Sequence, residues 1–139
     1  MDASVVLKWF LPELDSPAAD ILLEKFLNNE AELIAPDLLL LEVASALWKR
    51  VVLRKELSTD EANLIYRDLL TLPLPLSPSG PLLETAFQWA MKLGHSVYDV
   101  LYCALAAERG CDFVTADQAL ANKLGRAVPF ISHVSTIKP

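Results

Sequence analysis

Apolar residues recur at helical spacing through most of the chain, and capping residues, prolines and glycines divide this pattern into segments. The pair Ser16-Pro17 predicts a helix to about residue 28, because proline in the first turn has no N–H to leave unsatisfied. Asp37 is expected to cap a long helix that ends near residue 55. The sequence Ser58-Thr59-Asp60-Glu61 has the spacing of a capping box and predicts a third helix to about residue 70.

Two further long helices are predicted in the second half of the chain. Apolar positions recur from residue 82 to residue 93, and Gly94 is expected to end that helix. The next helix begins at Ser96 and ends at Gly110, and it is apolar nearly all round, as a buried helix must be. The predicted strands are residues 32–35, 72–76, 113–115 and 128–131, with a short helix between the last two. The second strand contains prolines and is therefore expected at the edge of a sheet.

Strands that alternate with helices predict an α/β fold, a three-layer sandwich in which a parallel sheet of about five short strands is covered by helices. With 139 residues, 53% of them hydrophobic, the chain is expected to form one domain over residues 1–139. Its longest apolar run, residues 100–107, is too short to span a bilayer, and no signal peptide is recognisable. We therefore expect a soluble, cytoplasmic protein without membrane contacts. Cys103 and Cys111 lack the spacing of a metal or redox motif and are expected to be free and mostly buried.

The net charge of −6 argues against broad affinity for nucleic acid, because binding to phosphate depends on clustered lysine and arginine. Any contact with RNA must therefore be local. Four of the 12 basic residues lie between positions 49 and 55, at the end of a predicted helix. This cluster is either a solvated helix end, where cations suit the helix dipole, or an RNA-binding edge.

Four acidic residues, Asp2, Glu42, Asp99 and Asp117, lie in four different segments of the chain. Asp117 follows the predicted strand 113–115, and ligands of parallel sheets bind outside the carboxyl ends of the strands. If the four carboxylates converged at roughly 5 Å, with an effective dielectric constant near 20, each pair would repel by about 3 kcal/mol. Such a cluster would need a cation, and a divalent metal is the natural one.

Three of these acids also have a structural interpretation. Asp99 completes a capping-box pattern that starts at Ser96. Asp117 could be the N-cap of the helix that follows it, and Asp2 could be a cap or part of a disordered terminus. Taken singly, these structural roles are at least as plausible as catalysis.

Glu42 is harder to explain as a structural residue. It lies in the middle of a largely apolar helix, where a carboxylate is costly unless it is paired or bound to a metal. Ser45 and Lys49 share its face at helical spacing, so a polar stripe leads toward the basic cluster. A salt bridge between Glu42 and Lys49 is the alternative to metal binding.

The segments that contain the four acids together resemble the motifs of PIN-domain ribonucleases, and the resemblance covers nearly the whole chain. The third motif, with Asp99, combined with the fourth at this separation is the most specific. The second is weaker, because Ser45 stands where the family often has asparagine. In its length the chain is similar to members of the VapC toxin branch, which cleave RNA and are silenced by a small antitoxin. The four motifs are residues 2–9, 36–47, 95–106 and 115–117.

The resemblance implies a metal-dependent endoribonuclease that acts as the toxin of a toxin–antitoxin pair. Asp2, Asp99 and Asp117 would be the main metal ligands, and Glu42 would bind a second metal or hold a water on the metal. The metal would be Mg²⁺, which suits oxygen ligands, and Mn²⁺ could replace it. Ser4 and Thr115 have hydroxyl groups beside these ligands and would support them, whereas His95 and His133 are interpreted as structural.

The resemblance also implies the partners: an RNA substrate left with 5′-phosphate and 3′-hydroxyl ends, a cognate antitoxin and a second copy of the chain in a homodimer. An arginine of the antitoxin could pair with the acidic cleft, and the apolar residues 5–7 and 9–11 could supply a groove for it, although core packing is the alternative. The family's first strand ends at the first aspartate, so this strand is expected to be truncated here, where only Met1 precedes Asp2. The rival interpretation is a catalytically inactive PIN-like binding module that keeps an acidic pocket.

Overall fold

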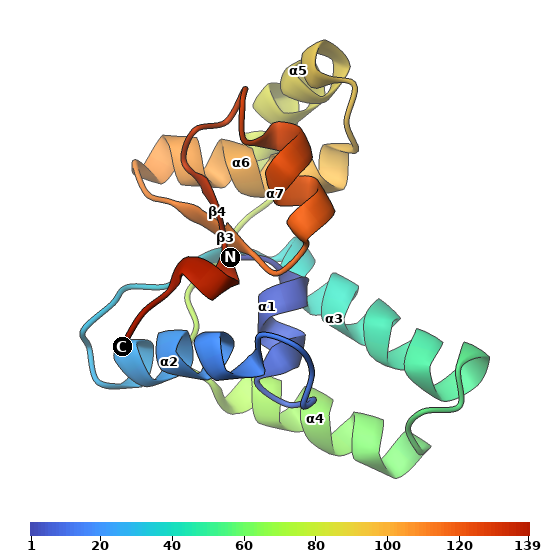
Figure 1. The fold of residues 1–139 in the computed structure, drawn as a ribbon. Coiled ribbons are helices and arrows are strands. Elements are labelled where there is room, and N and C mark those ends of the chain that lie inside the picture. Colours follow the sequence, from blue (N-terminus) through green and yellow to red (C-terminus); the bar gives the residue numbers. More distant parts are fainter.

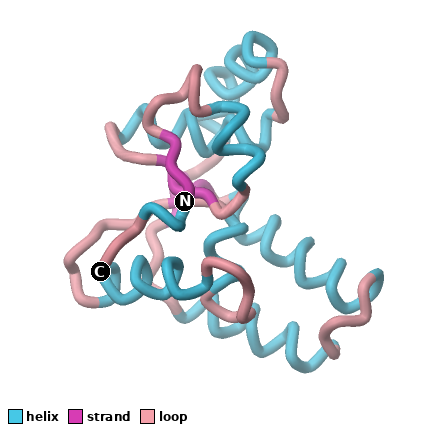
Figure 2. Tube along the Cα trace, in the orientation of Figure 1, coloured by secondary structure: helices cyan, strands magenta, loops and turns pink.

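The computed structural model describes residues 1–139 and contains seven α-helices and four short strands. The strands lie at the centre of the molecule, with α1 to α4 on one side and α5 to α7 on the other (Figure 1). Figure 2 shows how little of the chain is extended. In chain order the elements are α1 (Ala3–Lys8), α2 (Ser16–Leu27), β1 (Ala35–Pro36), α3 (Leu38–Trp48), the π-helical turn η1 (Lys49–Leu53), α4 (Thr59–Thr71), β2 (Leu76–Ser77), the 3₁₀ turn η2 (Gly80–Leu82), α5 (Leu83–Leu93), α6 (Val97–Arg109), β3 (Phe113–Thr115), α7 (Gln118–Leu124), β4 (Ile131–His133) and the 3₁₀ turn η3 (Val134–Thr136).

All strand pairing is parallel, as the alternation of strands and helices predicted. β1 pairs with β2, and β3 pairs with β4, so the strands form two sheets of two strands each. The α/β class with short parallel strands is confirmed. The expected single sheet of about five strands is replaced by these two pairs.

Met1 and Asp2 run between the two sheets, where the truncated first strand was expected. The ammonium group of Met1 donates to the carbonyl oxygen of Ile34 at 3.4 Å, and the N–H of Asp2 donates to the carbonyl oxygen of Val114 at 3.3 Å. Two residues cannot form a full ladder, so the sheets stay separate although this segment bonds to the chain on both sides. Burial lowers the pKa of the Met1 ammonium group from its ordinary value.

Proline explains why the strands are shorter than predicted or shifted. The expected strand 32–35 is present as Ala35–Pro36, because the ladder uses the N–H groups on either side of Pro36: Ala35 donates to Pro75 at 3.2 Å and Asp37 to Ser77 at 2.9 Å. The predicted strand 72–76 was wrong except at its end, since regular pairing begins only at Leu76, after the last proline of that segment. The last strand begins at residue 131 instead of 128, beyond Pro129.

The helices follow the prediction closely, because their end signals are local. The capping box is confirmed: the N–H of Ser58 donates to the Glu61 carboxylate at 2.8 Å, and the N–H of Glu61 donates to the Ser58 hydroxyl at 3.2 Å. Gly94 and Gly110 end α5 and α6 in the left-handed conformation, with φ of 63° and 62°. Asp37 occupies the N-cap position of α3, as predicted, but its side chain makes no capping hydrogen bond, because its carboxylate accepts the N–H of Ser79 instead.

The core lies around α6, whose residues 100–106 are all buried, as its apolar character predicted. In α1, which no end signal had predicted, Val5 and Val6 are fully buried. Core packing therefore accounts for Val5 and Val6, whereas Leu7, another residue that could have supplied a groove, also lines the largest acidic pocket of the structure. Cys103 is buried and Cys111 is exposed, so only the first fits the expectation, and both are free thiols. None of the helices is both long enough and apolar enough to span a bilayer.

Candidate active site

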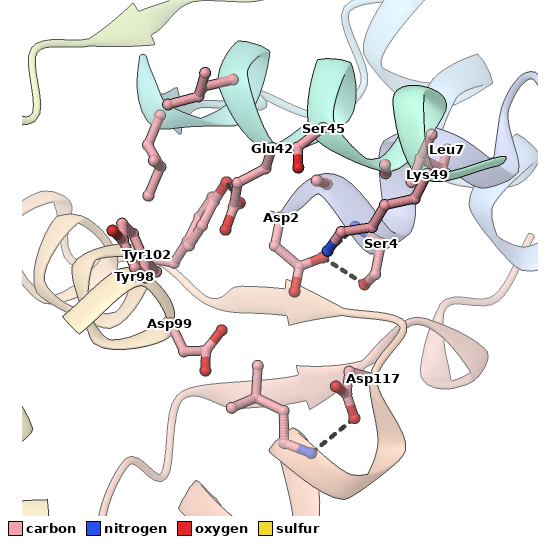
Figure 3. Close-up of a pocket in the computed structure, with 15 residues that line it drawn as sticks. Asp2, Ser4, Leu7, Glu42, Ser45, Lys49, Tyr98, Asp99, Tyr102 and Asp117 are labelled. Atoms are coloured by element: carbon pink, nitrogen blue, oxygen red, sulfur yellow. Dashed lines mark hydrogen bonds between the residues drawn. The ribbon is translucent and has the colours of Figure 1, made fainter. Parts of the chain in front are cut away.

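One cleft of about 530 Å³ is lined by all four predicted acids. They come from four places in the fold: Asp2 immediately precedes α1, Glu42 lies on α3, Asp99 lies in the first turn of α6, and Asp117 lies between β3 and α7. Figure 3 shows their side chains arranged around this cleft. Residues separated by more than 100 positions in the sequence thus share one surface.

Asp2 is held by a dense set of hydrogen bonds. Its Oδ1 accepts the Ser4 hydroxyl at 2.5 Å and the backbone N–H groups of Ser4 and Val5 at 3.0 and 3.3 Å, so Asp2 is the N-cap of α1. Its Oδ2 accepts the Thr115 hydroxyl at 2.5 Å. Asp2 is 8% exposed and hydrogen-bonded through both oxygens, which contradicts the alternative of a disordered terminus. The capping role and a place in the cleft are therefore compatible.

The hydroxyl groups of Ser4 and Thr115 connect Asp2 to the turn that carries Asp117. Ser4 Oγ accepts the N–H of Ala116 at 2.8 Å, and Thr115 Oγ1 accepts the N–H of Asp117 at 3.1 Å. Because each hydroxyl donates to Asp2 and accepts from this turn, the two segments are fixed relative to each other.

Asp117 also has the capping role that the sequence allowed. Its Oδ1 accepts the N–H of Leu120 at 2.9 Å at the start of α7. Asp99, in contrast, does not complete a capping box: Ser96 caps α6 by accepting the N–H of Tyr98, while Asp99 Oδ2 lies 3.2 Å from His95 Nδ1. His95, interpreted from sequence as structural, therefore contacts a candidate ligand.

Glu42 forms its side-chain hydrogen bond with a residue that the sequence had not singled out. The hydroxyl of Tyr102, on α6, donates to Glu42 Oε2 at 2.5 Å. The alternative salt bridge with Lys49 is absent, because the ion pairs of the structure include neither residue. Lys49 is exposed and lines the same cleft, so it contributes a cation that no carboxylate neutralises directly. Figure 3 shows its long side chain reaching over the cleft.

The electrostatics of the cleft disfavour its negative charges. Burial is the largest cause that raises the pKa values of Asp2, Glu42 and Asp99 above their ordinary values. The charge of Asp2 raises the pKa values of Glu42 and Asp99 further, and hydrogen bonds with neighbouring hydroxyl groups and His95 oppose these shifts in part. A cation in the cleft would relieve this repulsion.

The donor set of the cleft fits a hard divalent cation, because carboxylate and hydroxyl oxygens surround it and no thiol does. However, no three acidic, histidine or cysteine side chains lie close enough together to form a ready metal-binding group. The four carboxylates therefore share one cleft but lie farther apart than the ligands of a preformed metal site. It fits a Mg²⁺ or Mn²⁺ ion that keeps several of its waters and bonds to few side chains.

Of the basic cluster at residues 49–55, only Lys49 lines the acidic cleft. Arg50 pairs with Glu13 and, at 3.1 Å, with Glu56, so its charge is already neutralised. Arg54 and Lys55 are exposed and do not line the cleft. A solvated helix end thus describes the cluster well, with Lys49 as the exception.

The profile of the PIN domain matches residues 1–124 of the chain. The chain belongs to the PIN-domain family. This PIN domain is also 35% identical to "Ribonuclease VapC3" of Pyrobaculum aerophilum over 125 residues, which cover 88% of the chain and 92% of that protein. The resemblance to PIN-domain ribonucleases of the VapC type is thereby confirmed.

Two contacts of this PIN domain were not among the predictions from its sequence. Tyr102 contacts Glu42 across 60 positions, and nothing in either segment indicates the other. The contact of His95 with Asp99 had a local signal, because residues four positions apart at a helix start can meet, but the pattern was read as a cap centred on Ser96.

Proposed function

We propose that this chain is a metal-dependent endoribonuclease, a hydrolase that acts as the toxin of a toxin–antitoxin system and folds as one domain in the cytoplasm. The observation that carries the proposal is a single cleft lined by four carboxylates from four elements, in a chain of the PIN-domain family. Its similarity to a VapC ribonuclease supports RNA as the substrate class.

In this proposal Asp2, Asp99 and Asp117 are the main ligands of Mg²⁺ or Mn²⁺, and Glu42 completes the site. A bound divalent cation would polarise the phosphodiester, activate water and neutralise charge that develops on phosphate. Ser4 and Thr115 hold Asp2 through hydrogen bonds at 2.5 Å, so the first ligand is oriented before a cation arrives. Burial raises the pKa values of Asp2, Glu42 and Asp99, and the charge of Asp2 raises those of Glu42 and Asp99 further; a bound cation would offset both effects by stabilising the charged carboxylates.

Lys49 would bind the RNA backbone beside the acids. A chain with a net charge of −6 repels RNA at long range, so a local cation at the cleft has a large effect on substrate binding. Lys49 is exposed, forms no ion pair and lines the cleft, so its ammonium group is available to a phosphate. Its role would be to hold a phosphate near the carboxylates and not to take part in proton transfer.

The test uses the purified chain and a labelled single-stranded RNA with Mg²⁺, with Mn²⁺ or with excess chelator. We expect cleavage only with metal, products with 5′-phosphate and 3′-hydroxyl ends, and loss of cleavage on Asp117→Asn. Cleavage that persists in chelator, or that survives this substitution, contradicts the proposal. A mock purification from cells that lack this chain is the control for contaminating ribonucleases.

The second candidate is a catalytically inactive PIN-like module that binds RNA in an acidic pocket. The absence of three closely grouped metal-binding side chains is the observation that favours it. This module would bind RNA without turnover at any metal concentration. The cleavage experiment therefore separates the two candidates directly.

A cognate antitoxin is part of the proposal. A cleft with four carboxylates attracts a cationic side chain, and an arginine could form charge-assisted hydrogen bonds with two of them at once. We expect the product of the adjacent small gene to co-purify with this chain and to block cleavage. If that protein neither co-purifies with this chain nor inhibits cleavage, the result would argue against the toxin role.

A homodimer is the remaining part of the proposal, and an exposed apolar stripe on α5 supports it. Leu83, Phe87 and Met91 recur every four residues along this helix, and their side chains are 50%, 58% and 73% exposed. An antiparallel pair of such helices would place Phe87 against its own copy and Leu83 against Met91 of the other copy. This stripe would be self-complementary, as a two-fold interface requires.

A further inference from the structure

The contact between Glu42 and Tyr102 joins α3 and α6, two helices whose side chains line the cleft. The Tyr102 hydroxyl donates to Oε2 of Glu42 at 2.5 Å, and no other side chain forms a hydrogen bond or an ion pair with this carboxylate. Its other oxygen, Oε1, is left without a protein partner. One oxygen of Glu42 is therefore fixed, and the other is available.

Tyr102 is itself held rigidly. Its side chain is 4% exposed, and its ring stacks on Phe113 of β3 with centroids 5.5 Å apart and planes inclined by 10°. A buried hydroxyl needs a partner, and every buried side-chain polar atom of this structure has one. Burial and the charge of Glu42 raise the pKa of Tyr102, so the phenol stays neutral and remains a donor.

Glu42 lacks any comparable support from its own helix. It lies on α3 between apolar residues, its side chain is half-buried, and a glutamate has enough rotatable bonds to reach several positions in an open cleft. Asp2, in contrast, is fixed through both oxygens, because Oδ1 accepts from backbone and hydroxyl donors and Oδ2 accepts from a hydroxyl. The hydroxyl of Tyr102 orients the carboxylate of Glu42 by a hydrogen bond, as the hydroxyls of Ser4 and Thr115 orient that of Asp2.

We propose that Tyr102 is a positioning residue that fixes the carboxylate of Glu42 in the cleft and leaves Oε1 free for a divalent cation. The proposal rests on the proposed function, in which Glu42 contributes to cation binding. Tyr102 need not contact the RNA or the cation, and it acts only through Glu42. A structural role alone, in which Tyr102 merely fills the core and satisfies its own hydroxyl, would affect stability and nothing else.

A double-mutant cycle tests this coupling. The proteins are the wild type, Tyr102→Phe, Glu42→Gln, the double variant, and Tyr66→Phe as a control that removes a hydroxyl from a half-buried tyrosine on α4, outside the cleft. Two quantities are measured for each: the rate of RNA cleavage at saturating RNA, and the Mn²⁺ dissociation constant obtained from the way the melting temperature rises with Mn²⁺ concentration. The second readout does not depend on activity.

We expect Tyr102→Phe to weaken Mn²⁺ binding or cleavage by about 10- to 100-fold, as loss of a group that orients a metal ligand does. In the Glu42→Gln background the same change should have less than about a twofold effect, because the group through which Tyr102 acts is gone. Tyr66→Phe should match the wild type in both readouts.

Equal effects of Tyr102→Phe in both backgrounds would overturn the proposal, and so would a lowered melting temperature with unchanged Mn²⁺ binding and cleavage. Absence of cleavage by the wild type would instead count against the proposed function, while the Mn²⁺ readout would still test Tyr102. If the wild type does not bind Mn²⁺ either, a crystal structure of Tyr102→Phe decides. Glu42 in an unchanged position there would refute the positioning role.

Discussion

The substitution Asp99→Asn distinguishes most sharply between two roles of Asp99, that of a metal ligand and that of a purely structural residue. The substitution is nearly isosteric and removes one charge. The variant lacks an acidic residue in the first turn of α6, which lowers the free energy of unfolding by about 0.3–1 kcal/mol. It also loses the charged contact with His95, which contributes about 0–1 kcal/mol. It gains relief from burial and from the charges of Asp2 and Asp117, which raise the pKa of this carboxyl. Because the side chain is 37% exposed, these opposing contributions are screened, and the net change should stay within about 1 kcal/mol.

The expected result is therefore a metal-free melting temperature within about 4 °C of the wild type. Added metal should raise the melting temperature of the wild type much more than that of Asp99→Asn. A ligand present at 100 times its dissociation constant stabilises the wild type by about 2.7 kcal/mol, or roughly 10 °C, whereas a 100-fold loss of affinity leaves about 0.4 kcal/mol. RNA cleavage should disappear in the variant.

Melting curves with and without Mg²⁺, measured beside RNA cleavage, check this prediction. Asp37→Asn is the matched control, since Asp37 bonds to Ser79 away from the acidic cleft and should lose some stability while keeping its response to metal. Full cleavage by Asp99→Asn, or an unchanged metal-induced rise in its melting temperature, would refute the assignment of Asp99 as a ligand.

Three other predictions follow from the charges and surfaces of the molecule. Lys49→Ala should raise KM for RNA several-fold and reduce its salt dependence with little change in kcat, whereas Lys55→Ala should not; equal effects on KM would remove Lys49 from the site. Phe87→Glu should convert a dimer to a monomer in light scattering, while Leu64→Glu, on the exposed face of α4, should not; a wild-type monomer would contradict the dimer. The three cleft carboxyls with pKa values raised above the ordinary 3.8 and 4.5 retain protons longer in the folded state, so without metal their contribution to stability should be largest below pH 4 and be lost as the pH rises toward neutral. Mn²⁺ should suppress that loss in urea unfolding measured from pH 4.5 to 6.5, and a loss of the same size with and without Mn²⁺ would contradict this explanation.

The helices could be predicted from sequence because their ends depend on neighbouring residues. The capping box at Ser58 and the glycines at 94 and 110 need no knowledge of the rest of the fold. The strands could not be bounded in the same way, since a parallel ladder is made with a distant partner. Pro36 illustrates this: it sits inside a strand because the partner happens to accept bonds from the residues on either side.

The membership of the candidate site was also predictable, but its internal bonding was not. Asp2, Glu42, Asp99 and Asp117 were chosen from their local sequences, and all four line one cleft. The hydrogen bonds that hold them come mainly from distant segments, such as Thr115 for Asp2 and Tyr102 for Glu42. Such pairings depend on how helices and strands pack, which a single sequence does not reveal.

The bonds between Asp2 and the turn after β3 have a consequence for synthesis of the protein. Asp2 is made more than 100 residues before its partners Val114 and Thr115. A nascent chain that has not reached Thr115 cannot fix its first carboxylate, and a fold that depends on such distant contacts closes late. The first carboxylate of the site is therefore synthesised well before the site can be completed.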